Sequence, residues 1–138
     1  MLSKIIFPFS GKIVKIFRLS KPPILGIEIE EGRLMKGMPL GLIVDPIGKN
    51  ENCNVIKIGT VETIEQNGLT ISTGTKKNGC VGVKLDSNYT FDKIQENSNI
   101  ISYLTSESIS ILDEFFKKEI SDIEWKLVDD IKNYLHIK

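Results

Sequence analysis

The spacing of apolar residues changes once along the chain, and this change limits the possible folds more than any other feature. Over about the first hundred of the 138 residues, apolar and β-branched residues come in short runs separated by glycine and proline. Such runs are typical of half-buried β-strands. In the final third, apolar residues recur every three or four positions, as on one face of an α-helix. We therefore expect a mainly β fold that ends in helices.

Seven short runs are expected to form strands: residues 12–17, 24–30, 39–44, 55–63, 69–72, 81–85 and 100–104. Tight turns are expected at Gly32, at Gly37 and at Asn67-Gly68, where a backbone without a side chain or with a short polar one turns most easily. Residues 45–54 read as a polar loop. Repeated short strands with glycine-marked turns predict a closed or nearly closed antiparallel β-barrel over residues 1–104.

Residues 105–138 are expected to form a helical hairpin beside this barrel. The first helix is predicted over residues 106–118, capped by Thr105 or Ser106. Ser121 and Glu124 have the spacing of a capping box, which predicts the start of a second helix. Because only a few residues separate the two helices, they should fold back on each other.

The second helix has more apolar residues than one stripe needs. Its stripe consists of Trp125, Val128, Ile131 and Leu135, with Leu127 and Tyr134 beside it. The stripe can simply pack the hairpin together, which is the commonest use of such residues. The surplus would leave Leu127 or Tyr134 facing outward, where a partner could contact it.

Composition and charge exclude several classes of protein. The 18 basic and 18 acidic residues cancel, so no global field indicates a nucleic-acid or membrane partner. Locally the charge is uneven, because residues 1–27 contain five basic residues and no acid, whereas residues 103–138 contain eight acids and five lysines. No run approaches the roughly 18 apolar residues of a membrane span. Two cysteines, Cys53 and Cys80, cannot make a disulfide framework, so we expect a reducing compartment, the cytoplasm.

No catalytic constellation is evident in the sequence. The glycine-rich segment 74–82 includes Lys76 and Lys77 but lacks the spacing of a phosphate-binding loop. The single histidine, His136, has no cysteine or serine near it in sequence, and no metal-ligand spacing occurs. An enzyme that uses Cys80 or His136 in a barrel cleft stays an alternative, which thiol reactivity or turnover would favour. A general protein-interaction barrel is a further alternative.

Residues 24–40, with a strand ending at Gly32 and a second turn glycine, Gly37, before Pro39, resemble the barrel module of translational GTPases. With the segments that follow, they resemble the last domain of the eukaryotic initiation factor five-B family, relatives of bacterial initiation factor two. Residues 5–8 with 17–24, residues 58–65 and residues 76–85 then follow in the family's order. The segment 108–132 resembles the two terminal helices, which the bacterial relatives lack. The resemblance covers nearly the whole chain and favours the eukaryotic or archaeal type.

The resemblance implies a fold, an activity for the parent protein and a set of partners. The fold is a translation-factor-type antiparallel barrel followed by a two-helix hairpin. The family is a GTPase that promotes joining of ribosomal subunits during initiation. Its GTP- and Mg-binding domain precedes this region, so we expect this chain to bind no cofactor, to catalyse no reaction and to be a monomer. The partners implied are the ribosome, the acidic C-terminal tail of initiation factor one-A and the acceptor end of initiator methionyl-tRNA.

The resemblance assigns the tail of initiation factor one-A to the helices and the tRNA to the barrel. An acidic, isoleucine-bearing tail needs an apolar groove with cations at its rim. The expected tail-binding residues are Lys117, Lys118, Trp125, Lys126, Leu127, Val128, Ile131 and Lys132. For the tRNA end, the expected phosphate contacts are Arg18, Lys21, Arg33, Lys76 and Lys77. Lysines in surface loops are more often simply solvated, and this alternative stays open for each of them.

Overall fold

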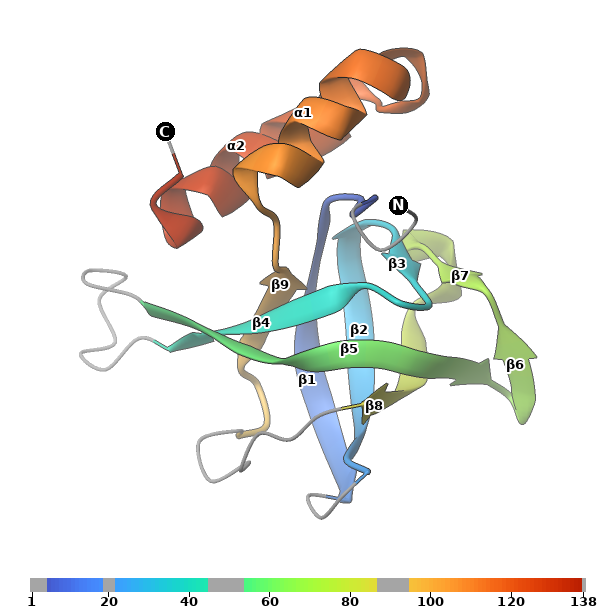
Figure 1. Cartoon of the computed structure of the whole chain (residues 1–138). Coiled ribbons are helices and arrows are strands. Elements are labelled where there is room, and N and C mark those ends of the chain that lie inside the picture. Colours follow the sequence, from blue (N-terminus) through green and yellow to red (C-terminus); the bar gives the residue numbers. More distant parts are fainter. Residues whose placement is uncertain (1–4, 19–21, 45–53, 87–94, 138) are drawn as a thin grey trace.

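Figure 1 shows the structure, a computed structural model, which describes residues 5–18, 22–44, 54–86 and 95–137. The strands are β1 (Phe9–Arg18), β2 (Ile24–Gly32), β3 (Leu34–Met35), β4 (Pro39–Val44), β5 (Asn54–Gln66), β6 (Leu69–Ile71), β7 (Thr73–Gly74), β8 (Cys80–Asp86) and β9 (Asn99–Ser102). The helices are α1 (Ser106–Phe115) and α2 (Asp122–Leu135), with short 3-10 turns η2 (Lys76–Asn78) and η3 (Lys117–Glu119).

Six strands form a ring that closes on itself. Their hydrogen-bonded order is β4-β9-β1-β2-β8-β5, and β5 also pairs with β4. Every pair in the ring is antiparallel. Strand β6 extends the ring beyond β5, while β3 and β7 pair separately. Closure gives each of the six strands a partner on both sides, which removes the exposed edges of an open sheet. The prediction of a closed antiparallel barrel is confirmed.

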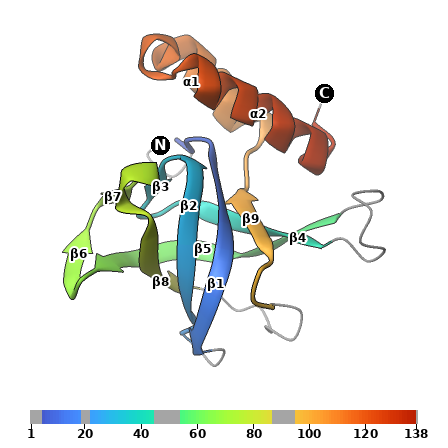
Figure 2. The same cartoon turned by 180° about the vertical axis from the view of Figure 1, so that it is seen from behind.

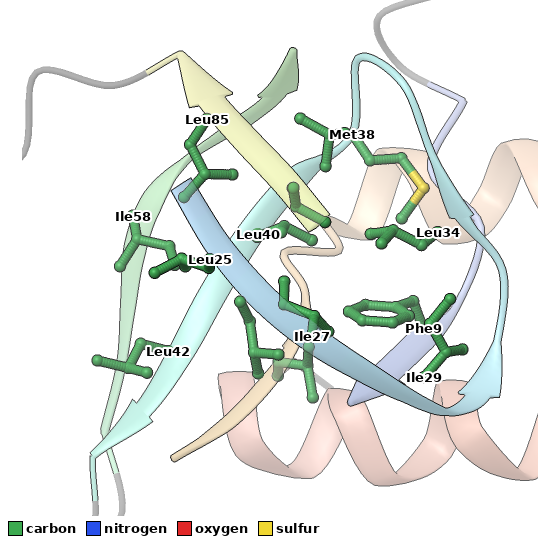
Figure 3. Packing of buried hydrophobic residues seen from close by; sticks show 14 of the residues in the cluster. Phe9, Leu25, Ile27, Ile29, Leu34, Met38, Leu40, Leu42, Ile58 and Leu85 are labelled. Carbon is green, nitrogen blue, oxygen red and sulfur yellow. The ribbon is translucent and has the colours of Figure 1, made fainter. Parts of the chain in front are cut away.

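The barrel is filled by alternate residues of its strands. Leu25, Ile27 and Ile29 of β2 are at most 2% exposed, and Figure 3 shows them beside Phe9 and Leu40 in the interior. Successive side chains of a strand point to opposite faces, so every second residue enters the core and the others form the outer wall. The two-residue alternation in the sequence therefore corresponds to the two faces of the barrel wall.

The two helices lie over one end of the barrel (Figures 1 and 2). Helix α2 places Leu127, Val128 and Ile131 in the same core cluster as the barrel residues. Helix α1 contributes Leu112 to a second cluster, together with Phe7 from the segment before β1. The hairpin is thus packed onto the barrel.

The clearest differences from the expectation are the end of the first helix and two additional short strands. The first helix ends at Phe115 rather than at Lys118, and η3 follows it. Ile120, which follows η3, belongs to the cluster of Phe7 and Leu112. The two-residue strands β3 and β7 were not expected, because two residues are too few to show an alternating pattern. Lys21, Cys53 and residues 45–53 of the expected polar loop lie outside the described residues.

Candidate partner-binding surfaces

Both helices begin with reciprocal caps. The Thr105 hydroxyl accepts from the Ser108 backbone N–H, while the Ser108 hydroxyl accepts from the Thr105 N–H. At the start of α2, the Ser121 hydroxyl accepts from the Glu124 N–H and the Glu124 carboxylate accepts from the Ser121 N–H. These bonds satisfy N–H groups that have no partner within the helix. The predicted capping box is confirmed, and Thr105 rather than Ser106 is the first cap.

Arg33 joins the barrel to the start of α2. Its Nε donates to Glu124 Oε2 at 2.9 Å and its Nη2 donates to Glu124 Oε1 at 3.2 Å. Nη2 also donates to the backbone oxygen of Glu119. The guanidinium lies over the Phe7 ring, 4.6 Å from its centroid, and that ring meets the Phe116 ring edge-on at 5.5 Å. Arg33 therefore connects the N-terminal segment, the β2–β3 turn and the helical hairpin.

The electrostatics of this junction follow from its hydrogen bonds. Partial burial alone would raise the pKa of Glu124. Hydrogen bonds from the Arg33 guanidinium and the Ser121 backbone, together with the positive charge of Arg33, outweigh it and hold this pKa below its usual value. The carboxylate is therefore ionised at neutral pH and the pair is a true ion pair.

Three of the residues expected to bind the tail of initiation factor one-A are in the core. Leu127, Val128 and Ile131 are 8%, 2% and 0% exposed. Their packing against the barrel supports the alternative that the apolar stripe holds the hairpin in place. Of the two residues that the surplus could leave facing outward, Leu127 is buried because the barrel covers α2 on that side, and Tyr134 is partly buried and packs against the same core. These three side chains are not available to a partner in this structure.

The other residues of that set lie at or near the surface. Lys117, Lys118 and Lys126 are exposed, and Trp125 and Lys132 are partly buried. The Lys117 Nζ lies 3.8 Å from Asp113 Oδ1, one turn earlier in the hairpin. Lys117, Lys118 and Lys126 are therefore open to solvent on the hairpin.

Two exposed apolar residues of the hairpin were not expected from the sequence. Phe115, the last residue of α1, is 69% exposed, and Ile123, near the start of α2, is 64% exposed. Both lie at the end of the hairpin where η3 connects the helices. The sequence could have indicated their exposure, because both lie outside the apolar stripes of the helices. An apolar residue on the polar face of an amphipathic helix is not required for packing.

The residues expected to contact tRNA fall into two groups at opposite ends of the barrel. Arg18 pairs in register with Ile24, the first residue of β2, whereas Lys76 lies 3.7 Å from Glu31 near the end of β2. The eight steps from Ile24 to Gly32 span about 26 Å. Arg33 lies at the same end of the barrel as Lys76, but its guanidinium is already paired with Glu124.

Lys76 and Lys77 border a cleft between the barrel and the hairpin. The cleft has a volume of about 360 Å³, and its other walls include Arg33, Ser121 and Ile123. Hydrogen bonds within the turn and to strand β5 fix η2, which carries the two lysines. Within it, the Thr75 N–H donates to Asn78 Oδ1, and the side chains of Asn78 and Gln66 of β5 are hydrogen-bonded at 2.9 Å. The two lysines are thus presented on a fixed turn.

The described residues show little that suggests catalysis. Among them, no group of three or more histidine, cysteine or acidic side chains could hold a metal ion. Cys80 is exposed on β8, whereas His136 ends α2 in the left-handed conformation with φ of 58°. The two candidates of the enzyme alternative therefore belong to separate elements. In the part of the chain that the structure describes, no helix is both long and apolar enough to span a membrane.

Comparison with known proteins identifies the family. The chain matches no protein-family model. It is 30% identical over 140 residues to eukaryotic translation initiation factor 5B of Schizosaccharomyces pombe, and 27% identical to the factor of Homo sapiens. Both matches cover 96% of this chain, which spans only 13% and 11% of the length of these relatives.

A solved structure shows the same fold. It is the crystal structure of GDP-bound aIF5B from Aeropyrum pernix, with a TM-score of 0.76 and 19% sequence identity. The match covers 96% of this chain and 21% of that one. The ring of strands and the two terminal helices thus occur together in a translation factor. The chain belongs to the translation initiation factor 5B family, of which it is a C-terminal domain.

Proposed function

We propose that this domain is a binding module of a GTPase that joins ribosomal subunits, and that it works in the cytoplasm as a monomer. It contributes no catalytic group and no cofactor site, while GTP and Mg bind elsewhere in the parent protein. The helical hairpin binds the acidic tail of initiation factor one-A, and the barrel holds the acceptor end of initiator methionyl-tRNA on the ribosome. Membership of the family supports this division of roles.

One observation carries the tail-binding role: the hairpin exposes apolar and cationic side chains together. Phe115 and Ile123 are largely exposed, and Lys117, Lys118 and Lys126 lie on the same hairpin. Exposed apolar surface costs free energy in water unless a partner covers it. A peptide that alternates acidic residues and isoleucines matches both features. The negative charge of the segment as a whole opposes long-range attraction, so the binding depends on these local contacts.

A peptide titration tests the tail-binding role. The C-terminal peptide of initiation factor one-A is added while the fluorescence of Trp125, the single tryptophan, is recorded. We expect saturable binding that Lys126→Glu and Ile123→Ser weaken. Lys57→Glu, a charge reversal of an exposed lysine on β5, is the matched control and should bind as the native chain does. Absence of binding at about 1 mM peptide, where only ~4 kcal/mol is required, would contradict the proposal.

The tRNA role is tested separately with the same protein. Fluorescently labelled initiator tRNA is titrated at several salt concentrations. We expect binding that weakens as salt rises, because cations that contact phosphates release counterions. Equal affinity for an unrelated acidic polymer such as heparin would show that the contact is only electrostatic, and would contradict a specific role for the barrel.

A further inference from the structure

Asparagine is followed by glycine at two places in the chain, Asn67-Gly68 and Asn78-Gly79. Asparagine is chemically labile because the backbone nitrogen of the next residue can attack its side-chain carbonyl carbon. Glycine favours this attack, since it has no side chain to shield the nitrogen or to restrict the backbone. The two pairs are equivalent in sequence, but the structure places them in different surroundings.

Asn67 and Gly68 are the central residues of the turn between β5 and β6, at the outer edge of the molecule (Figures 1 and 2). Both residues are exposed. A Cβ added at Gly68 would meet no atom within 4 Å, so water has access to the backbone there. Among the described residues, neither the Asn67 side chain nor the Gly68 N–H has a hydrogen-bond partner. Both reacting groups are therefore free to move.

The backbone of this turn is suited to ring closure. Asn67 and Gly68 have φ of 54° and 79°, and positive values at both central residues are those of a type I′ turn. Rotation of the single peptide group between them gives a type II′ turn, which also fits a hairpin. The rotation brings the Gly68 nitrogen to the side of the Asn67 Cβ, as closure of a five-membered ring requires. Glycine accepts either sign of φ, so the strands need not separate.

Hydrogen bonds hold both reacting groups of the second pair. Asn78 Oδ1 accepts from the Thr75 N–H at 2.9 Å, and Asn78 Nδ2 donates to Gln66 Oε1 at 2.9 Å. The attacking group of this pair, the Gly79 N–H, donates to the Lys76 carbonyl oxygen at 3.1 Å. Ring closure at Asn78 requires these bonds to break in a local opening of the turn. Asn78 is therefore protected in the folded domain.

We propose that Asn67 is a site of spontaneous deamidation in the folded domain, and that Asn78 is not. The Gly68 nitrogen loses its proton to water and bonds to the Asn67 Cγ, and the side-chain nitrogen leaves as ammonia. A second water opens the resulting succinimide at one of its two carbonyl groups, which gives either aspartate or isoaspartate. The net reaction consumes one water and releases one ammonia. This modification is additional to the binding roles proposed above and requires no partner.

Isoaspartate at this position also loosens the turn η2. The two-residue loop sets the register of β5 and β6, in which Gln66 pairs with Leu69. Isoaspartate adds one carbon atom to the main chain of the loop, so this pairing no longer fits. Gln66 is the β5 residue that fixes η2, because its Nε2 donates to the Asn78 carbonyl oxygen at 2.5 Å in addition to the side-chain bond. Displacement of Gln66 therefore releases the turn that carries the two lysines.

Peptide mapping by mass spectrometry tests the site. The native chain is incubated in mildly alkaline buffer, and the conversion of amide to acid is followed at both asparagines. We expect Asn67 to react about tenfold or more faster than Asn78 in the folded chain, and at a similar rate in the chain unfolded by urea. The rate at Asn67 should rise with pH, because the attacking nitrogen must lose its proton. Equal rates in the folded chain, or an unreactive Asn67 in it, would overturn the proposal.

A variant tests the protection of Asn78. Gln66→Leu removes the partner of the Asn78 side-chain amide but leaves the Asn67-Gly68 pair in place. We expect deamidation of Asn78 to become about tenfold faster, while that of Asn67 changes little. An unchanged rate at Asn78 would show that the bonds to Gln66 do not protect it.

NMR spectra of the aged chain test the effect on η2. The aged chain contains both products, so the amide signals of residues 76–79 should split into two sets, one of them at the native positions. Asn67→Asp is the matched control, since it has the same charge as isoaspartate but a main chain of normal length, and it should show only the native set. A single native set in the aged chain, or the same shifts in Asn67→Asp, would overturn the link between Asn67 and η2. None of these measurements uses a partner, so they leave the tail-binding and tRNA roles to their own tests.

Discussion

Arg33 is a cation near the surface whose contacts hold two parts of its own chain together. In the sequence it is one of several basic residues near a turn, and the resemblance assigns it to tRNA. In the structure its guanidinium is held by Glu124, by the Glu119 carbonyl and over the Phe7 ring. A planar group with five donors matches such a set of acceptors, which a lysine could not do. We therefore leave Arg33 out of the proposed RNA contacts.

Arg33→Gln should destabilise the domain by about 1–3 kcal/mol at neutral pH, because it leaves the partly buried Glu124 without its charged partner. The folded-state pKa of Glu124 is lowered, so its stabilising contribution is present above the unfolded-state pKa and is lost as the pH falls through the folded-state pKa. The difference between the two proteins in urea unfolding should therefore be largest near neutral pH and shrink in acid.

Lys117→Gln is the matched control for this prediction. It also removes a cation from an acidic neighbour, but the side chains of Lys117 and Asp113 are 73% and 64% exposed. Exposed pairs contribute little, so its effect should stay below about 0.5 kcal/mol at every pH. A loss that is equal for Arg33→Gln and Lys117→Gln, or independent of pH, would contradict the assigned role of the ion pair.

Two turn glycines with similar backbones should respond differently to alanine. Gly32 and Gly37 have φ of +81° and +88°, so each substitution costs about 1–2 kcal/mol in backbone strain. At Gly32 a Cβ would lie 2.0 Å from the Pro8 carbonyl oxygen, while at Gly37 nothing lies within 4 Å. Gly32→Ala should therefore lower the free energy of unfolding by clearly more than Gly37→Ala. Equal losses in chemical denaturation would show that the Pro8 contact is not maintained.

At the scale of elements, the helical hairpin has two apolar surfaces with different uses. The inner surface, made by Leu127, Val128 and Ile131, is buried against the barrel. The outer apolar residues, Phe115 and Ile123, are exposed at the connected end of the hairpin. Helical periodicity identifies the inner surface because a core stripe must repeat, whereas two isolated outer residues do not form a pattern.

Alanine substitution on the two surfaces distinguishes these uses. Ile131→Ala should destabilise the domain by about 2–5 kcal/mol, because it removes a fully buried side chain and leaves a cavity. Ile123→Ala should change the stability by no more than about 0.5 kcal/mol but weaken binding of the acidic peptide. Thermal unfolding and the fluorescence titration measure the two effects. A large loss of stability in Ile123→Ala would mean that this residue packs rather than binds.

At the scale of the whole molecule, the barrel and the hairpin share one core. Residues of α2 belong to the same hydrophobic cluster as Ile13, Leu40 and Ile58, which lie on strands of the ring. The second cluster adds Phe7, which precedes β1, to Leu112 of α1. The boundary at residue 104, which the change of period predicts, therefore separates two kinds of secondary structure, and the hydrophobic packing crosses it.

This shared core predicts cooperative unfolding. The fluorescence of Trp125 reports on the hairpin, and the far-ultraviolet circular dichroism signal of the strands reports on the barrel. Because neither part buries its apolar surface alone, both signals should change at the same urea concentration, as for a single two-state domain. An earlier transition of Trp125 would show that the hairpin detaches first, and would assign it to a separate unit.

The sequence alone predicted the order and kind of the main elements, a closed or nearly closed barrel, the capping box at Ser121 and Glu124, and the resemblance to the family. These depend on local periods, turn chemistry and a recurring order of motifs, all of which are written along the chain. The binding sites could be predicted only as residue types. Lysines and apolar residues were singled out by their chemistry alone, and their roles in binding stay predictions.

Only the tertiary structure decided which of these residues are exposed and which lie close to one another. Register and closure placed Arg18 and Lys76 at opposite ends of the barrel, and packing buried Leu127 while leaving Ile123 exposed. They also brought Phe17 of β1 against Gly26 of β2. Exposure and proximity depend on contacts between residues far apart in the sequence, and a local pattern contains no information about which distant segment will cover it.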